Sequence, residues 1–486
     1  MHDSNTPKSI SADIRARLGH PVIDADGHWI EPIPLFLDYL REVGGTDMRD
    51  RVVREKKQNI WYDLSPEERL ARRLPRPWWW GETSHTLDRA TSMLPDLLHH
   101  RLDEFGVDFG IVYSTLAFDF VAHPDAELRQ AACRALNNLN HDAFDSYRKR
   151  LTPAAVLPMF TPDEAIAELD YAAGELGFKV AMLTNHVRRP IPAHVEAGVD
   201  PARADYYIDN LVLESEYDYD PLWAKFVEHR IAVTTHADSI GWGDRRSGNF
   251  VYNHIGHFAA ASHAFTKGLV LSGVLHRFPT LKFAMLEGGV GWACNLLTDL
   301  IGHWEKRTPE ALMQNTLPTN LDMEQLAELF RRHGGQRYED KLDELLGCLS
   351  MAAPFLSPAE AAAREPKDGL DDFAANPIKS AEALRAQFSG QLYFGCESDD
   401  LSTVWAFDKH GNHRLNPLFS SDFSHFDVVH MNKVLEEAYE LVDHEMISPA
   451  EFEEFVFGNI AELHTAMNPD FFVGTVVEDA VKARQA

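Results

Sequence analysis

The sequence lacks the cysteine pattern of a disulfide-stabilised or zinc-ribbon protein. Only four cysteines occur in 486 residues, and no two of them lie close together in the chain. Paired cysteines at short spacings mark structural zinc sites, and dense sets of cysteines mark secreted scaffolds. We therefore expect a reducing compartment and a cytoplasmic protein.

Long apolar segments are also missing. The longest apolar run, Leu269 to Leu275, is far too short to span a bilayer. The first twenty residues contain no apolar segment of the kind found in secretory signals. Neither a membrane nor an export pathway is expected for this chain.

Positive charge is scarce. The chain has 46 Lys and Arg against 75 Asp and Glu, which gives a formal net charge of −29. Such a surface repels phosphate backbones and anionic membranes, so we expect no nucleic-acid partner and a small-molecule substrate instead. Apolar residues make up 45% of the chain, enough for a large core.

Short apolar, strand-like runs alternate with longer stretches of helical periodicity. One clear helix is expected over residues 125–150, where Leu128, Ala132, Leu136 and Leu139 recur at helical spacing. Eight β-then-α units in order favour an α/β fold, a (β/α)8 TIM barrel. The expected strands are residues 22–28, 109–114, 152–157, 179–184, 231–236, 282–287, 391–397 and 417–422.

Two stretches interrupt this alternation. Residues 34–102 follow the first strand and contain the cluster Trp78, Trp79 and Trp80, which could line an apolar pocket or a subunit contact. Residues 309–389 lie between the sixth and seventh strands and are largely helical in pattern. Because barrels with insertions exceed 400 residues, we expect residues 1–486 to form a single domain with two helical insertions.

Ionisable side chains stand at the ends of several expected strands. Asp24, Asp26 and His28 alternate along the first strand and would share one of its faces. Strands five, six, seven and eight end at His236, Glu287, Glu397 and Asp422. The C-terminal ends of barrel strands form the active-site face, and buried carboxylates there are costly unless they are paired or bind a metal.

A divalent cation explains this gathering of groups. Imidazole and carboxylate ligands together suit Zn, Mn or Fe. A plainer interpretation exists for each residue alone, since the chain has 24 histidines and an Asp after a strand is often a helix N-cap. The coincidence of Asp26, His28, His236 and Asp422 on strands one, five and eight favours a metal site.

At these residues the sequence resembles the amidohydrolase superfamily, in the amidohydrolase 2 branch related to aminocarboxymuconate-semialdehyde decarboxylase. The resemblance spans nearly the whole chain through the segments IDADGHWIEP, RLDEFGVDFGIVYST, LTPAAVLP, SGVLHRFPTLKFAMLEGGVGW, FSSDFSHFD and FVFGNIAELH. It implies a distorted (β/α)8 barrel with one catalytic divalent metal, held by Asp26, His28, His236 and Asp422. His425 matches a histidine common after the last-strand aspartate, and many relatives are homodimers.

The sequence departs from the family pattern at two strands. Relatives often have His-Gly-Gly after strand six, where this chain has Glu287-Gly288-Gly289. The lysine that ends strand four in two-metal relatives is missing here, since that strand ends in Asn185-His186. Glu287 could therefore bind or bridge metal ions, or it could orient His236, and two ions stay an alternative to one. Glu397 could be a further ligand or the partner of an arginine.

The expected catalytic residues are Asp422, Glu287 and His236. The expected substrate contacts are Trp292, His257 and His425, although the histidines of the segment NHIGHFAAASHAF could equally pack against the barrel rim. The resemblance implies decarboxylation or hydrolysis of a carboxylated cyclic or aromatic molecule, with Asp422 moving a proton. Two alternatives stay open: a non-heme iron oxygenase that uses a carboxylate-rich site, and a catalytically silent barrel.

Overall fold

The computed structural model describes most of the chain. The described residues are 9–57, 60–72, 83–199, 205–236, 247–315, 320–349, 360, 363, 371–408 and 414–486. Trp78, Trp79 and Trp80 lie outside these ranges, so the two interpretations of that cluster stay predictions.

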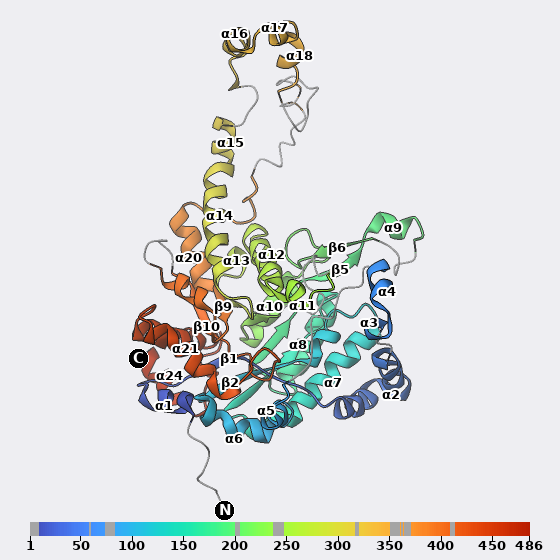
Figure 1. The fold of residues 1–486 in the computed structure, drawn as a ribbon, viewed down its shortest axis with the longest axis vertical. Helices are drawn as coiled ribbons and strands as arrows, with labels where there is room; N and C mark the ends of the chain where they lie inside the picture. Colours follow the sequence, from blue (N-terminus) through green and yellow to red (C-terminus); the bar gives the residue numbers. More distant parts are fainter. Residues whose placement is uncertain are drawn as a thin grey trace, which may run out of the picture. The chain divides into compact units, whose positions relative to one another are not determined.

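Eight parallel strands form the centre of the molecule, and helices surround them (Figure 1). The sheet closes because the His28 N–H donates to the Phe423 carbonyl at 3.1 Å and the Asp422 N–H donates to the Asp26 carbonyl at 2.9 Å. The predicted (β/α)8 barrel and its eight strands are confirmed. In sheet order they are β1 (Ile23–Trp29), β2 (Phe109–Ser114), β3 (Leu151–Val156), β4 (Val180–Leu183), β7 (Val233–Thr235), β8 (Phe283–Met285), β9 (Leu392–Cys396) and β10 (Asn416–Phe419).

A helix follows each barrel strand in the chain. In α7 (Ala126–Phe144) the Asp125 carboxylate caps the N-terminus by accepting from the Leu128 N–H, and the predicted apolar positions are buried. The 3-10 turn η2 (Asp145–Tyr147) ends that helix earlier than the pattern predicts. The other helices that follow barrel strands are α6 (Pro95–Phe105), α8 (Pro162–Gly174), α10 (Asp220–His229), α12 (His257–Leu271), α14 (Gly291–Arg307), η5 (Leu401–Phe407) and α21 (Val434–Asp443).

The remaining helices belong to the two insertions, the chain ends and the connections between β4 and β8. The chain divides into two compact units, residues 1–296 with 385–486, and residues 297–384. The second unit falls within the expected second insertion and the end of α14. Four helices lie in the second unit: α15 (Pro309–Asn315), α16 (Met323–Gly334), α17 (Gln336–Glu339) and α18 (Leu342–Leu346). Helix α20 (Ala381–Gln391) crosses the boundary between the units. The additional helices of the first unit are α1 (Ile10–Arg17), α2 (Ile33–Lys57), α3 (Ile60–Asp63), α4 (Pro66–Ala71), α5 (Thr86–Thr91), α9 (Pro192–Glu196), α11 (Phe250–His254), α13 (Val274–Arg277), α22 (Pro449–Glu453), α23 (Asn459–Thr465) and α24 (Glu478–Gln485).

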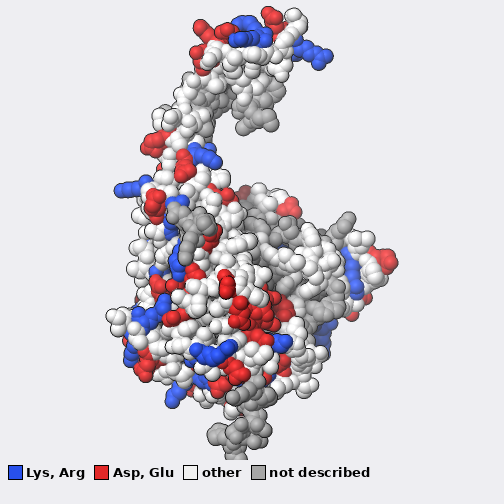
Figure 2. All heavy atoms as spheres, turned by 60° about the vertical axis from the view of Figure 1, so that its left-hand side comes forward, with Lys and Arg blue, Asp and Glu red and all other residues white. Residues whose placement is uncertain are grey.

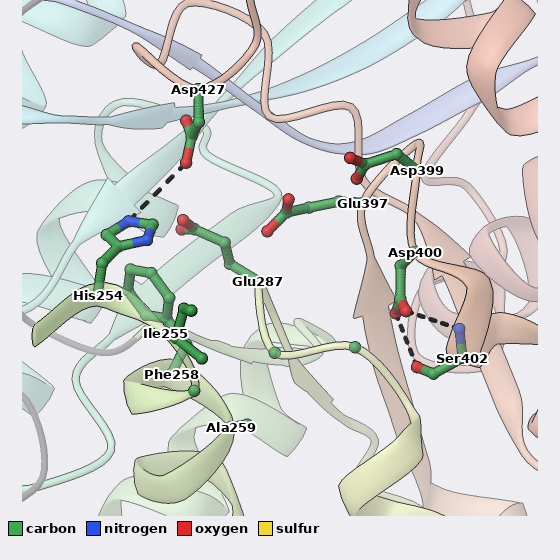
Figure 3. Close-up of a pocket in the computed structure, with 13 residues that line it drawn as sticks. His254, Ile255, Phe258, Ala259, Glu287, Glu397, Asp399, Asp400, Ser402 and Asp427 are labelled. Atoms are coloured by element: carbon green, nitrogen blue, oxygen red, sulfur yellow. Dashed lines mark hydrogen bonds and ion pairs between the residues drawn. The ribbon is translucent and has the colours of Figure 1, made fainter. Parts of the chain in front are cut away.

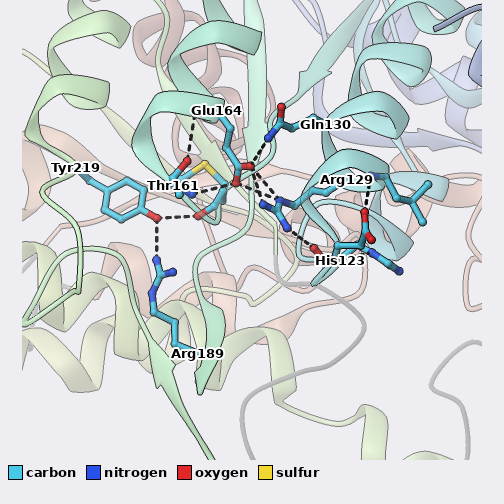
Figure 4. Close-up of polar contacts among 10 residues, drawn as sticks. His123, Arg129, Gln130, Thr161, Glu164, Arg189 and Tyr219 are labelled. Atoms are coloured by element: carbon cyan, nitrogen blue, oxygen red, sulfur yellow. Dashed lines mark hydrogen bonds and ion pairs between the residues drawn. The ribbon is translucent and has the colours of Figure 1, made fainter. Parts of the chain in front are cut away.

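An antiparallel hairpin after β4 does not follow from the sequence pattern. Strands β5 (Val187–Pro190) and β6 (Tyr206–Asp209) pair with each other and not with the barrel. Buried polar contacts hold the hairpin, because Arg189 pairs with Asp209. Arg189 also donates to the Tyr219 hydroxyl at 3.1 Å (Figure 4). The Tyr219 hydroxyl in turn donates to the Met159 carbonyl at 2.7 Å, which ties the hairpin to the segment after β3.

Candidate metal centre

Four of the predicted metal-ligating side chains come from the strand ends of the barrel. Asp26 and His28 lie within β1, and both are completely buried. His236 follows β7 directly, and Asp422 comes three residues after β10. Parallel strands that close into a barrel present their C-terminal ends on one face, so these four side chains converge there.

The distances show that these groups share one site. His28 Nε2 lies 3.4 Å from Asp26 Oδ1 and 3.3 Å from Asp422 Oδ1. His236 Nε2 lies 2.6 Å from Glu287 Oε2. Two overlapping sets offer ligand atoms within 4.8 Å of one another: His28, Glu287, Asp422 and His425, and Asp26, His28 and His236. The five residues predicted to bind the metal are therefore brought together, and His425 joins them.

The buried polar atoms of this cluster fit a bound cation. In the described part of the chain, neither oxygen of Asp26 and neither ring nitrogen of His28 makes a hydrogen bond. Buried groups of this kind are costly unless a charge compensates them. A divalent cation would supply that charge to a mixed nitrogen and oxygen ligand set, which suits Zn, Mn or Fe.

The pKa values shift in the direction expected for groups whose charge a bound cation would compensate. Burial raises the pKa of Asp422 well above its ordinary value, and the negative charge of Glu287 raises it further. Burial likewise raises the pKa of Asp26, while it lowers the pKa of His28, with the nearby His425 adding to that effect. Each group thus favours its neutral form until a cation is present.

The backbone is left-handed at two carboxylates of the cluster. Glu287 has φ 51° and Asp422 has φ 52°, although neither is glycine. Such conformations cost energy for residues with a Cβ and gather at functional sites. The turn after each strand thus points a carboxylate toward the barrel mouth instead of continuing the strand.

His425 lies against the ligands, where the sequence predicts a substrate contact. Its Nδ1 is 2.7 Å from Asp422 Oδ1, and its Nε2 is 3.2 Å from Thr115 Oγ1. Its ring stacks on His28 with 3.7 Å between centroids. Thr115 was not expected from the sequence, because a lone threonine after β2 carries no recognisable signal.

Phe118 and Phe258 form an apolar wall that sequence reasoning missed. The rings of Phe118 and Phe258 lie 4.6 Å and 5.3 Å from the ring of His236. His257 packs on Phe258 at 3.7 Å, with its Nδ1 2.8 Å from the His254 carbonyl oxygen. Trp292 packs edge-on against Phe394 at 5.4 Å. The substrate-binding roles of His257 and Trp292 stay predictions.

Asp24 has a structural role, although it shares a strand with Asp26. Its carboxylate accepts from the Ser421 N–H at 2.9 Å and from the Ser421 hydroxyl. It also accepts from the Asp26 N–H at 3.2 Å. Asp24 therefore fastens β1 to the end of β10, and it is not a member of the metal cluster.

A cavity of about 420 Å3 adjoins the cluster (Figure 3). Glu397, whose role the sequence leaves open, lines it, and no described arginine pairs with its carboxylate. Burial raises the pKa of Glu397 well above its ordinary value, and the charge of Glu287 raises it further. The residues around the cavity are His254, Ile255, Gly256, Phe258, Ala259, Glu287, Gly288, Gly289, Glu397, Asp399, Asp400, Ser402 and Asp427.

The fold and the residues at the strand ends define an amidohydrolase-type barrel. The chain belongs to the Amidohydrolase family, whose sequence profile matches residues 23–334. This confirms the resemblance seen in the sequence. No curated protein matches the sequence significantly.

Solved structures share the fold at low identity. A dihydroxybenzoic acid decarboxylase from Polaromonas sp. JS666, with bound manganese and the inhibitor 2-nitroresorcinol, is 14% identical with a TM-score of 0.51. That match covers 93% of this chain and 99% of the decarboxylase. An amidohydrolase from Mycobacterium avium subsp. paratuberculosis K-10 is 16% identical, with 92% and 100% of the two chains covered and a TM-score of 0.53. Among the described residues, no helix has the length and apolarity needed to cross a membrane.

Proposed function

We propose that the protein is a metal-dependent enzyme that decarboxylates a carboxylated cyclic or aromatic small molecule, with hydrolysis of such a molecule as the related activity. The observation that carries this proposal is the set of buried side chains at the barrel mouth. His28 Nε2 lies 3.4 Å from Asp26 Oδ1 and 3.3 Å from Asp422 Oδ1, and all three side chains are buried. The solved neighbour that is a decarboxylase of dihydroxybenzoic acid, with manganese bound, supports the choice of decarboxylation.

Asp26, His28, His236 and Asp422 would hold the metal, with Glu287 as a further ligand. A bound divalent ion would act as a Lewis acid, neutralising the substrate carboxylate and withdrawing charge as the bond to carbon breaks. Manganese is the first choice because carboxylate ligands outnumber imidazoles in this set. Zinc and iron stay alternatives.

Asp422 and His425 are the residues that would hold and transfer the proton that replaces the lost carboxyl group. Asp422 Oδ1 lies 2.7 Å from His425 Nδ1, within hydrogen-bonding distance. Asp422, whose pKa is raised by burial, would deliver a proton to the carbon that loses carbon dioxide. In a hydrolysis the same carboxylate would accept a proton from the attacking water. Glu287, 2.6 Å from His236 Nε2, would orient that imidazole.

The test is release of carbon dioxide under anaerobic conditions from a panel of hydroxylated benzoic acids and cyclic carboxylic acids. Manganese-loaded protein should release carbon dioxide from at least one member. Asp422→Asn should lower kcat by at least about 100-fold, the usual contribution of a proton donor, with an unchanged circular dichroism spectrum. Normal turnover by the variant would contradict the assignment of Asp422.

The number of carboxylates favours one alternative, a non-heme iron oxygenase with two ions. Asp26, Glu287 and Asp422 give three carboxylates beside two to three imidazoles, which resembles the donor set of di-iron proteins. Metal analysis separates the two functions. Two irons for each chain together with substrate-dependent oxygen consumption would support the oxygenase, whereas one manganese and no oxygen consumption would support the decarboxylase.

A further inference from the structure

The imidazole of His425 has a polar neighbour at each of its two nitrogens. Its Nδ1 lies 2.7 Å from Asp422 Oδ1, and its Nε2 lies 3.2 Å from Thr115 Oγ1. Asp422 and His425 are only 1% and 2% exposed, so water has little access to the ring. Both nitrogens of a buried ring thus contact side chains, one from the turn after β10 and one from the turn after β2.

Ring stacking alone does not determine which edge of this imidazole faces Asp422. The His425 ring lies on the His28 ring with 3.7 Å between centroids and 22° between the planes. A half-turn of the imidazole about its bond to Cβ would keep this stacking but would exchange the positions of nitrogen and carbon atoms. The turned ring would lose both polar contacts. Asp422 and Thr115 together therefore select the orientation of the ring.

The same two partners determine which ring nitrogen carries the hydrogen. An ionised carboxylate only accepts hydrogen bonds, so Asp422 in its ionised form requires an N–H at Nδ1 of His425. The Nε2 atom of a neutral imidazole is then an acceptor, and a hydroxyl group can donate to it. Thr115 supplies this hydroxyl group. A hydrogen bond at one ring nitrogen thus fixes the state of the other.

Thr115 is itself held in place through its two neighbours in the chain. The Glu31 carboxylate accepts from the Leu116 N–H at 2.9 Å and from the Ser114 hydroxyl. Glu31 is buried and comes two residues after the end of β1. The backbone that carries Thr115 is therefore fastened to the strand that carries two of the predicted metal ligands.

The chain after Thr115 continues along the metal centre. Thr115 precedes the 3-10 helix η1 (Leu116–Asp119), which includes Phe118. The Phe118 ring lies 4.6 Å from the ring of His236 and 6.5 Å from the ring of His425. The segment after β2 thus brings a polar and an apolar side chain to the site, and neither is of a type that binds a divalent metal as an imidazole or a carboxylate does.

We propose that Thr115 is a positioning residue, whose hydroxyl donates to Nε2 of His425 and so keeps Nδ1–H directed at Asp422. The inference rests on the proposed function in one respect, because it is the proton transfer by Asp422 and His425 that this orientation serves. It also separates His425 from the metal ligands, since both of its nitrogens have hydrogen-bond partners in this arrangement.

Thr115→Val tests the hydroxyl group, because it removes the oxygen and keeps the shape of the side chain. For the substrate found by the carbon dioxide assay, kcat should fall by about 10–100-fold, the usual cost of losing a group that orients a partner in a metal site. KM and the Kd of manganese should not change. Thr115→Ser keeps the hydroxyl and should recover most of kcat. The exposed Thr46 of α2 provides the control Thr46→Val, which should behave as wild type.

A double-variant cycle shows whether Thr115 acts through His425. His425→Phe keeps an aromatic ring and removes both nitrogens. Adding Thr115→Val to His425→Phe should cause no further loss of kcat, because no imidazole is left to orient. Losses that multiply would give Thr115 a separate role and overturn the inference. A loss in Thr115→Val that serine does not restore, accompanied by a lower Tm, would overturn it in favour of a structural role.

Nuclear magnetic resonance of protein labelled with 15N at histidine tests the contact without substrate. The His425 signals are those missing in His425→Phe. In metal-free protein, Thr115→Val should shift the Nε2 resonance, whereas Thr46→Val should not. In protein loaded with zinc, a diamagnetic ion, His425 should carry its hydrogen at Nδ1. A hydrogen at Nε2, a zinc-bound Nε2 or an unshifted resonance in Thr115→Val would overturn the inference. Release of no carbon dioxide from any acid would contradict the proposed function alone, since these spectra need no substrate.

Discussion

At the scale of single residues, Asp24 and Asp26 lie on the same strand but differ in their surroundings. This difference gives Asp24 a structural role and supports the predicted metal-binding role of Asp26. Asp24 and Asp26 are both completely buried in β1. Three donors, two of them from Ser421, satisfy Asp24, whereas in the described chain the carboxylate oxygens of Asp26 accept no hydrogen bond. A buried charge without partners reduces stability, and a cation would reverse this effect.

Replacing Asp26 with Asn should therefore affect manganese binding, whereas replacing Asp24 with Asn should affect stability. Asp26→Asn should weaken manganese binding at least about tenfold, as lost metal contacts do, while the metal-free protein becomes no less stable. Asp24→Asn should keep manganese binding and lower the free energy of unfolding by about 1–3 kcal/mol, since a donor would face Ser421. Isothermal titration and urea unfolding of both variants measure the two quantities. Equal loss of manganese binding in both variants would contradict the division of roles.

Glu31 links stability to pH. The side chain is buried, accepts from the Leu116 N–H at 2.9 Å and from the Ser114 hydroxyl, and has its pKa raised from 4.5 to about 7, mainly by burial. A carboxyl group whose pKa is higher in the folded state binds its proton more readily when folded. Its contribution to stability is therefore complete below pH 4.5 and is lost as the pH rises toward 7.

Replacing Glu31 with Gln should remove this dependence. The free energy of unfolding of the wild-type protein, relative to Glu31→Gln, should fall by about 3 kcal/mol between pH 4.5 and pH 7. Urea unfolding at a series of pH values measures the difference, which cancels the titration of all other groups. The exposed Asp443→Asn variant serves as a control with no such slope. A constant difference between wild type and Glu31→Gln would show that Glu31 titrates normally.

At the scale of elements, the contact between β1 and β10 determines whether the barrel closes. The ring of Phe423, which is fully buried, lies directly over Gly27. A Cβ at Gly27 would lie 2.3 Å from that ring, closer than atoms can approach. Gly27 therefore allows the turn that carries Asp422 to lie against β1 next to Asp26 and His28.

Gly27→Ala should separate these strands. Overpacking of this kind should lower the free energy of unfolding by about 1–3 kcal/mol and should weaken manganese binding. The double variant Gly27→Ala/Phe423→Leu should recover part of both losses, because the smaller side chain makes room. Gly174→Ala, where a Cβ meets nothing within 4 Å, is the control and should cost no stability. Additive losses in the double variant would contradict the steric explanation.

The elements that the sequence predicts well are those with a repeating pattern. Buried parallel strands are continuous apolar runs, so all eight barrel strands were found, although β8 and β10 end two and three residues before their predicted ends. These differences arise where Glu287 and Asp422 take left-handed conformations, which a strand pattern does not reveal. Hairpin β5–β6 was missed because Arg189 and Asp209 stabilise it by a buried ion pair between residues far apart in sequence.

The prediction of the site from the sequence was limited in the same way, because only residues that follow a repeating pattern could be found. Asp26, His28, His236 and Asp422 were predictable because each stands at the end of an apolar run, and strand ends meet in a barrel. The position of Thr115 beside His425 and the apolar wall of Phe118 and Phe258 were not predictable. They depend on how loops after different strands pack together, and a single sequence carries no record of that packing.

At the scale of the whole molecule, the charge of −29 affects how any metal experiment is interpreted. Figure 2 shows a dense group of acidic side chains on one face. Every cation weakens the mutual repulsion of such a surface, so manganese would raise stability to some extent without occupying a specific site. Site binding must therefore be separated from this general effect.

The separation is possible because site binding saturates and depends on single residues, whereas screening depends on ionic strength alone. At a manganese concentration 100 times its Kd, the free energy of unfolding should rise by about 2.7 kcal/mol above the value in sodium chloride of equal ionic strength. The His28→Ala variant loses the residue common to both ligand sets, so its stability in the two salts should be equal. Calorimetric unfolding of both proteins at matched ionic strength provides the comparison. An equal gain in wild type and variant would assign the whole effect to the acidic surface and leave the cluster at the barrel mouth without a metal.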